Sequence, residues 1–326
     1  MKLADRPDKR HMKRTHDSNM SSLLAKLAGA LDEAVGLLNH RSSVRELFQA
    51  DATMDEASLL EQCIALSAQQ LARPPEPVRT IHHFACAGGT LISKCIAALP
   101  NVQLFSEMDP LSSLYEDATR PTFSPTDFII QLRQNTRGVD QALLIKAFQS
   151  QLILMHEEAV RRGLRLVIRD HSHSHYCSGP QVPSRPSLRA MVSDRLPCKA
   201  LVTVRDPIDS YASLVLNKWI TFQPADFDEY CRRYMRFLDD YVDVPVMRYE
   251  DFVADADGAM GKVCEVLDLP INPAFKEVFD VFRITGDSGR SGGAIHSRPR
   301  RSEAEEFARQ AQSSLSYAPL ANRLGY

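Results

Sequence analysis

The sequence predicts an α/β domain with a mainly parallel β-sheet flanked by helices, preceded by an N-terminal helical extension. Two observations predict this class. From residue 78 onward, short β-rich segments alternate with helical ones, which is the pattern of βαβ units with parallel strands. The 326 residues are 44% hydrophobic and 25% charged, which is ordinary for a globular chain with a full core.

The first 77 residues differ from the rest of the chain. Residues 1–20 are polar and basic, which predicts a flexible tail. Apolar residues recur at three- and four-residue steps in 21–40 and 55–72, the period of amphipathic helices. We therefore expect a helical extension and linker over 21–77 and the α/β domain over 78–326. The extension packs either on its own domain, the preferred interpretation, or against a second copy of the chain in a homodimer.

Charge and cysteine content exclude several classes of protein. Thirty-nine Lys and Arg against 41 Asp and Glu give a net charge of −2, which argues against a protein that coats nucleic acid. The seven cysteines are widely spaced, without a C-x-x-C, so neither a disulfide framework nor a zinc ribbon is predicted. Apolar runs are too short for a membrane span and no secretory signal is visible, so we expect a cytoplasmic protein.

The elements of the α/β domain are predicted from residue patterns. Runs of β-branched and apolar residues indicate strands, and apolar stripes at helical spacing indicate helices. Pro100 ends the first helix, while Asp206 and Pro207 are a typical cap and first turn of a later one. The expected order is strand 78–84, helix 91–99, strand 102–105, helix 139–162, strand 164–169, strand 200–204, a helix from 206 and strand 244–247.

A small-residue loop links the first strand to the first helix. Gly88 and Gly89 let backbone N–H groups converge, the helix N-terminus adds partial positive charge, and Thr90 adds a hydroxyl. This combination is typical of a phosphate site, although a tight turn without a ligand has the same sequence. The loop is not a Walker A motif, because Lys94 follows Ser93 instead of a glycine.

A second candidate anion site lies in residues 201–219. The strand delivers Arg205 at its carboxyl end, the helix cap follows at once, and Ser213 lies two turns into the helix. A guanidinium and a hydroxyl can then converge on one phosphate. The alternative is that Arg205 pairs with Asp206 or Asp209 and that Ser213 has no ligand.

Arg205, Pro207, Asp209 and Ser213 form the pattern R-x-P-x-D-x-x-x-S, and here the chain resembles a known family. It is similar to the sulfotransferases that use 3′-phosphoadenosine 5′-phosphosulfate (PAPS), whose first βα loop holds the 5′-phosphosulfate and whose second motif holds the 3′-phosphate. Residues 289–292 resemble the family's closing loop, and 247–252 its "RYEDF" stretch. The cofactor-binding residues that the resemblance implies are Ala87, Gly88, Gly89, Thr90, Leu91, Arg205, Ser213, Arg290, Ser291 and Gly292.

The resemblance implies a P-loop NTPase-like sulfotransferase architecture and a reaction. A sulfuryl group would pass from PAPS to a hydroxyl or amine of an unidentified small-molecule or glycan acceptor, releasing 3′-phosphoadenosine 5′-phosphate (PAP), without a metal. Loops 106–125 and 172–187 are expected to line the acceptor site, because they follow strands at the carboxyl edge. Two alternatives stay open: a catalytically impaired protein that binds PAP or PAPS, and a P-loop kinase-like enzyme.

The histidines after the third predicted strand are the candidates for the base. His171, His173 and His175 alternate, so on extended backbone they would face one way. A metal site is not predicted, because no Cys or carboxylate lies at a familiar ligand spacing. Exposed loop histidines without a catalytic role are a further alternative. By resemblance, Arg169 matches a basic catalytic residue and His171 the general base, with His173 as alternative. Some family branches use a glutamate, and Glu107 is the candidate for that role.

One loop position departs from the family pattern. Where many sulfotransferases place a Lys or Arg, this chain has Ala87, preceded by Cys86. Charge in the transition state must then be met by backbone N–H groups, the helix dipole, Lys94 or Arg169. Arg169 is the preferred substitute, since it leaves the sheet at the same edge as the loop.

Overall fold

The computed structural model describes residues 74–114, 121–286, 294–297 and 299–326. Pro75–Tyr326 forms one compact unit. The predicted tail, nearly all of the helical extension, and the site candidates Arg290, Ser291 and Gly292 lie outside the described residues. Six cysteines lie within them, and each has a free thiol.

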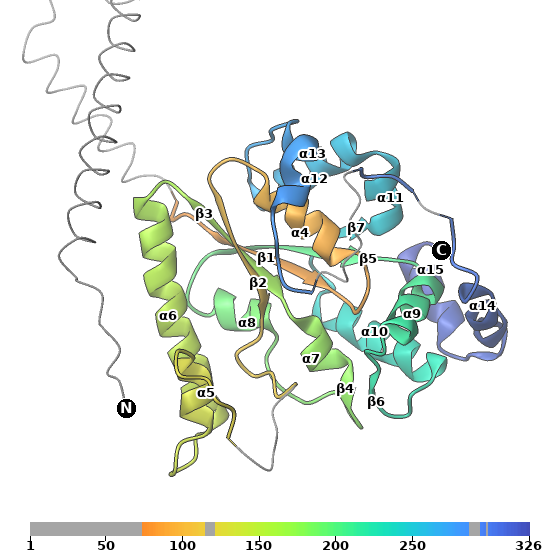
Figure 1. Ribbon diagram of the computed structural model, residues 1–326, viewed down its shortest axis with the longest axis horizontal. Helices are drawn as coiled ribbons and strands as arrows, with labels where there is room; N and C mark the ends of the chain where they lie inside the picture. The colour runs from red at the N-terminus through yellow and green to blue at the C-terminus, as the bar shows by residue number, and fades with distance from the viewer. Residues whose placement is uncertain (1–73, 115–120, 287–293, 298) are drawn as a thin grey trace, which may run out of the picture. The chain divides into compact units, whose positions relative to one another are not determined.

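A five-stranded parallel sheet forms the centre of this unit, which confirms the predicted fold class (Figure 1). The strands lie in the order β2-β3-β1-β5-β7. They are β1 Val78–His83, β2 Val102–Met108, β3 Arg165–Asp170, β5 Cys198–Val204 and β7 Val246–Arg248. The chain places β2 and β3 on one side of β1 and then β5 and β7 on the other. The carboxyl edge around β1 is therefore the topological switch point where such sheets bind ligands.

Strand register aligns the candidate site residues at that edge. Ile81 in β1 lies opposite Arg169 in β3 and Leu201 in β5. The residues that follow Ile81, including His83, therefore leave the sheet beside Arg169. Successive residues point to opposite faces, so Val167 packs into one hydrophobic layer and Ile168 into the other.

Helices cover both faces of the sheet. In Figure 1, α4, α12 and α13 lie on one side and α6, α8 and α10 on the other, in agreement with the hydrophobic clusters they join. The larger helices are α4 Gly89–Ala97, α6 Gln141–Arg161, α9 Pro207–Leu216, α10 Phe227–Asp240, α12 Ala256–Leu267, α14 Ala304–Ser313 and α15 Tyr317–Leu324. The smaller elements are α5 Phe128–Arg133, α7 Ser172–Tyr176, α8 Leu188–Ser193, α11 Tyr249–Ala254, α13 Phe275–Val278, the 3₁₀ turn η1 Phe279–Val281, and β4 Ser178–Gly179 paired with β6 Thr221–Phe222.

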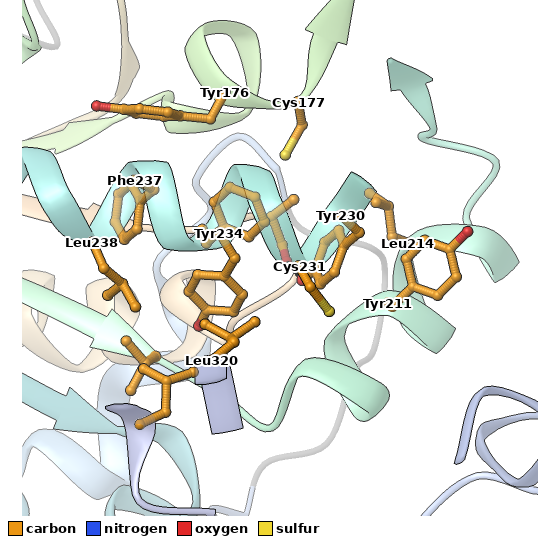
Figure 2. Close-up of a cluster of buried hydrophobic side chains, with 14 of the residues drawn as sticks. Tyr176, Cys177, Tyr211, Leu214, Tyr230, Cys231, Tyr234, Phe237, Leu238 and Leu320 are labelled. Carbon is orange, nitrogen blue, oxygen red and sulfur yellow. Dashed lines mark hydrogen bonds between the residues drawn. The ribbon is translucent and has the colours of Figure 1, made fainter. Parts of the chain in front are cut away.

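Tyr230, Tyr234 and Phe237 of α10 belong to a buried hydrophobic cluster next to the candidate site (Figure 2). Tyr230 and Tyr234 stand one turn apart on α10, so their hydroxyls reach the same edge of the sheet. The Tyr230 hydroxyl donates to the carbonyl of Ala85 at 3.2 Å. The Tyr234 hydroxyl accepts from the backbone N–H of Arg205 at 3.1 Å. One helix thereby positions the glycine loop and the arginine of the second motif.

None of the helices in the described part of the chain is both long and apolar enough to span a bilayer.

Candidate active site

The glycine loop follows β1 and leads directly into α4. Gly88 is the N-cap of α4 and has φ +81°, which L-residues with a side chain rarely adopt. A Cβ at Gly88 would overlap the ring of Tyr249, and a Cβ at Gly89 would overlap the ring of His83. No side chain caps this helix N-terminus. Both glycines are therefore required by close packing, and the helix end is the kind that accepts an anion.

The two residues before the glycines bring no charge to the loop. The Ala87 side chain is fully buried, so nothing at this position faces a ligand. Cys86 has φ +60°, a strained conformation for a residue that is not glycine. Burial raises the pKa of the Cys86 thiol to about 12, so it stays neutral at physiological pH.

Arg169 lies where the loop lacks a cation. Its guanidinium is almost fully buried. Its Nη2 donates to the Thr90 hydroxyl and to His83 Nε2, both at 3.0 Å. Its Nη1 donates to the Ser106 hydroxyl at 3.1 Å and to the Thr285 carbonyl at 2.8 Å. The structure thus places the positive charge of β3 against the first turn of α4.

Glu107 joins the same group from the end of β2. A register shift between Phe105 and Met108 disturbs the pairing of β2 with β3, and Glu107 has φ +58° there. Its carboxylate lies 3.3 Å from Arg169 Nη2 and is about one-fifth exposed. A strained residue held by an ion pair at a sheet edge is a typical feature of functional sites.

His83 is a site residue that the sequence reasoning missed. It ends β1 next to the glycine loop, and that position was the available signal. Burial lowers the pKa of His83 well below its ordinary value, and the nearby charges of Arg169 and His171 lower it further. His83 is therefore a neutral acceptor for Arg169, and it helps to orient the guanidinium.

The histidines after β3 do not lie on extended backbone, so that prediction was wrong. Residues 172–176 form the short helix α7. The Ser172 hydroxyl donates to the Asp170 carboxylate at 2.9 Å, which turns the chain immediately after the strand. Asp170 also contacts His82 Nδ1 at 2.8 Å and accepts from the Tyr241 hydroxyl at 3.1 Å. This buried network replaces the extended continuation that alternation alone suggested.

Two of the three histidines stay together on the turn. The rings of His171 and His173 stack with centroids 6.2 Å apart. His175 is buried separately, with Nε2 3.3 Å from the Pro183 carbonyl oxygen. Burial, assisted by the neighbouring His171, lowers the pKa of His173 to about 4. His171 and His173 are both partly exposed, whereas His175 is buried.

Arg205 and Ser213 come together as the second motif requires. Arg205 Nη1 lies 3.4 Å from the Ser213 hydroxyl and 3.4 Å from the Cys86 carbonyl of the glycine loop. Its guanidinium stands over the Tyr249 ring at 5.0 Å. Arg205 Nε is buried without a hydrogen-bond partner among the described residues. This unsatisfied buried donor is a group that an acceptor on a ligand would satisfy.

Asp206 and Asp209, the alternative partners expected for Arg205, form ion pairs with Arg300 instead. Arg300 lies 2.5 Å from the Asp206 carboxylate and 3.0 Å from that of Asp209. No described carboxylate lies within ion-pair distance of Arg205, so the alternative that it pairs with one of these aspartates is wrong. A pocket of about 280 Å³ opens beside it, lined by Arg205, Asp209, Tyr249, Glu250, Val253, Ser297, Pro299, Arg300 and Arg301.

A metal centre finds no support in the described part of the chain, where no three His, Cys, Asp or Glu side chains gather as ligands.

The buried histidines predict a pH-dependent stability. His83 and His173 have folded pKa values below the ordinary 6.5, so the unfolded chain takes up protons that the folded chain does not as pH falls below about 6.5. The free energy of unfolding should therefore decrease from pH 7 to pH 5, with a share from His173 on the order of 2 kcal/mol. Denaturant unfolding at pH 7 and at pH 5 measures this change in the free energy of unfolding. His173→Gln should flatten the dependence and His296→Gln, at an exposed site, should not; an unchanged slope in His173→Gln would contradict the assignment.

Comparisons with known proteins gave matches to solved structures and none to family models or curated proteins. Among solved structures, the mouse sulfotransferase SULT7A1 complexed with PAP matches with a TM-score of 0.37 and 13% identity, over 80% of this chain and 92% of that one. Sulfotransferase STF9 from Mycobacterium avium matches with a TM-score of 0.35 and 13% identity, over 78% and 80%. Since both TM-scores lie below 0.5, neither likeness supports a function for this chain.

Proposed function

We propose that this protein is a PAPS-dependent sulfotransferase that transfers a sulfuryl group to a hydroxyl or amine and releases PAP. The observation that carries the proposal is the position of Arg205. It lies between Ser213 and the Cys86 carbonyl of the glycine loop, without a carboxylate partner among the described residues. Two anion-binding elements are thereby adjacent, as a ligand with phosphate groups on both sides of one nucleoside requires.

The residues present fit such a ligand. Arg205 and Ser213 would hold the 3′-phosphate, since Arg205 Nε has no partner of its own among the described residues. Thr90, Arg169 and the uncapped start of α4 would hold the 5′-phosphosulfate. The Tyr249 ring packs on Gly88 and faces the Arg205 guanidinium, so it holds the glycine loop and the arginine–serine motif at a fixed separation.

Bound PAPS would supply an activated sulfuryl group: the acceptor oxygen or nitrogen bonds to sulfur, the bond from sulfur to the 5′-phosphate oxygen breaks, and PAP leaves. Arg169 stabilises the charge that develops on the phosphate, in place of the cation missing at Ala87. His171 takes the acceptor proton as general base. Glu107, in contact with Arg169, is the alternative base.

Calorimetry with PAP, ATP and GTP tests the nucleotide. We expect PAP to bind and the two triphosphates to bind more weakly, because the loop has no Walker A lysine. Tight ATP binding with none for PAP would contradict the proposal.

Transfer of labelled sulfate from PAPS to a panel of phenols, glycans and amines then tests the reaction. His171→Ala should abolish turnover with PAP affinity retained; if Glu107→Gln does so instead, the base is Glu107.

A second candidate is a protein that binds PAP without catalysis. It is favoured by the neutral Ala87 and by the acceptors among the described residues that already engage Arg169, which include Ser106, Thr285, His83 and Thr90. PAP binding without transfer to any acceptor of the panel would support this candidate.

A further inference from the structure

Two backbone carbonyls occupy donors of the candidate phosphosulfate site. The Thr90 hydroxyl donates to the Gly286 carbonyl at 3.0 Å. Arg169 Nη1 donates to the Thr285 carbonyl at 2.8 Å. Both donors are groups that the proposed function assigns to the anion. A carbonyl oxygen and a sulfate oxygen are both acceptors, so each carbonyl holds a position that the ligand would need.

The approach of this segment depends on a glycine. Gly286 has φ +70°, and a Cβ there would overlap the Glu107 carboxylate and lie 3.2 Å from Arg169 Nη2. Gly286 thus fits among three groups of the site, Thr90, Glu107 and Arg169, only because it lacks a side chain. A larger residue would force either the segment or the Glu107 side chain outward.

We propose that Thr285–Gly286 is an autoinhibitory strap: it holds Thr90 and Arg169 in the free protein, and the anion of the nucleotide must displace it. The proposal rests on the proposed function. Because only molecules with the strap released can bind, the observed affinity is reduced by the fraction that is released. Releasing the strap by mutation should therefore tighten binding, the opposite of the usual effect of a substitution in a site.

Gly286→Val tests the strap, since a β-branched residue at this φ is strongly disfavoured. Gly138→Val is the matched control, because Gly138 has φ +74° and open space around its Cβ position. Calorimetry should give PAP binding about tenfold tighter for Gly286→Val than for the unchanged chain, and equal binding for Gly138→Val. Limited trypsin cleavage after the exposed Arg283, without ligand, should be faster in Gly286→Val alone. The milder Gly286→Ala should change both readouts in the same direction.

The outcomes distinguish a failure of the strap proposal from a failure of the proposed function. Faster cleavage with PAP affinity equal to or below that of the unchanged chain would overturn the strap as an inhibitor. Unchanged cleavage at Arg283 in both Gly286 variants would overturn the contact itself. If cleavage is faster but no form of the protein binds PAP, the proposed function fails and the contact is retained.

Discussion

Replacing Arg205 by alanine should weaken PAP binding by about 100-fold or more. Charge-assisted hydrogen bonds from an arginine fork to phosphate are among the strongest polar contacts in proteins. Arg205 has only long contacts of 3.4 Å from its Nη1 and an unpartnered Nε among the described residues, so most of its bonding capacity is left for a ligand. Calorimetric titration of PAP measures the loss.

Arg189→Ala is the matched control for this experiment. Arg189 carries the same charge on α8 and pairs with Asp243 at the surface. Its removal should leave PAP affinity unchanged. Arg205→Lys should recover part of the affinity, because it keeps the charge and loses the fork. If Arg205→Ala unfolds cooperatively and binds PAP like the unchanged chain, the 3′-phosphate is not held by this motif.

Replacing Gly88 by alanine should lower the free energy of unfolding by about 3 kcal/mol and abolish PAP binding. The left-handed φ of +81° costs a residue with a Cβ about 1–2 kcal/mol. The added methyl would also overlap the Tyr249 ring, which supports Arg205 from below. Urea unfolding and PAP calorimetry on the same preparation measure both effects.

Gly163→Ala is the control that separates the backbone strain of a positive φ from the steric overlap with the Tyr249 ring. Gly163 has φ +69° and no atom within 4 Å of the added Cβ, so its replacement carries the backbone strain alone. Gly163→Ala should lower the free energy of unfolding by about 1 kcal/mol and leave PAP binding intact. Equal losses in Gly88→Ala and Gly163→Ala would show that Tyr249 moves aside without cost, and would remove the proposed link between the loop and Arg205.

The fold class could be predicted because it follows from local patterns. β-branched runs and helical stripes alternate along 78–247, and the five strands of the main sheet begin and end within a few residues of the predicted ones. The helices after α9 were not predicted, and neither was α5, whose six residues include none that is buried and so form no core-facing stripe. The order of strands was not predicted, since pairing between β3 and β1 joins segments far apart in the sequence.

Some residues of the candidate site could likewise be predicted from local sequence, and others depend on contacts between distant segments. Gly88, Arg205 and Ser213 could be picked out because each depends on its position in a local strand–loop–helix pattern. His83 could not be assigned a role, because its role comes from Arg169, which lies on another strand. The turn at α7 was mispredicted for the same reason: the Asp170 network that forms it includes Tyr241 of a distant helix end.

The sequence by itself determined a parallel α/β domain, a glycine loop and an arginine–serine motif, because residue types at fixed local spacing dictate these features. Only the tertiary structure decided what the cationic and acidic groups contact. It assigned Asp206 and Asp209 to Arg300 instead of Arg205. It also brought Glu107 and the Gly286 carbonyl to the first turn of α4, in contact with Arg169 and Thr90. Such contacts are set by register and packing between distant segments, which no local spacing encodes.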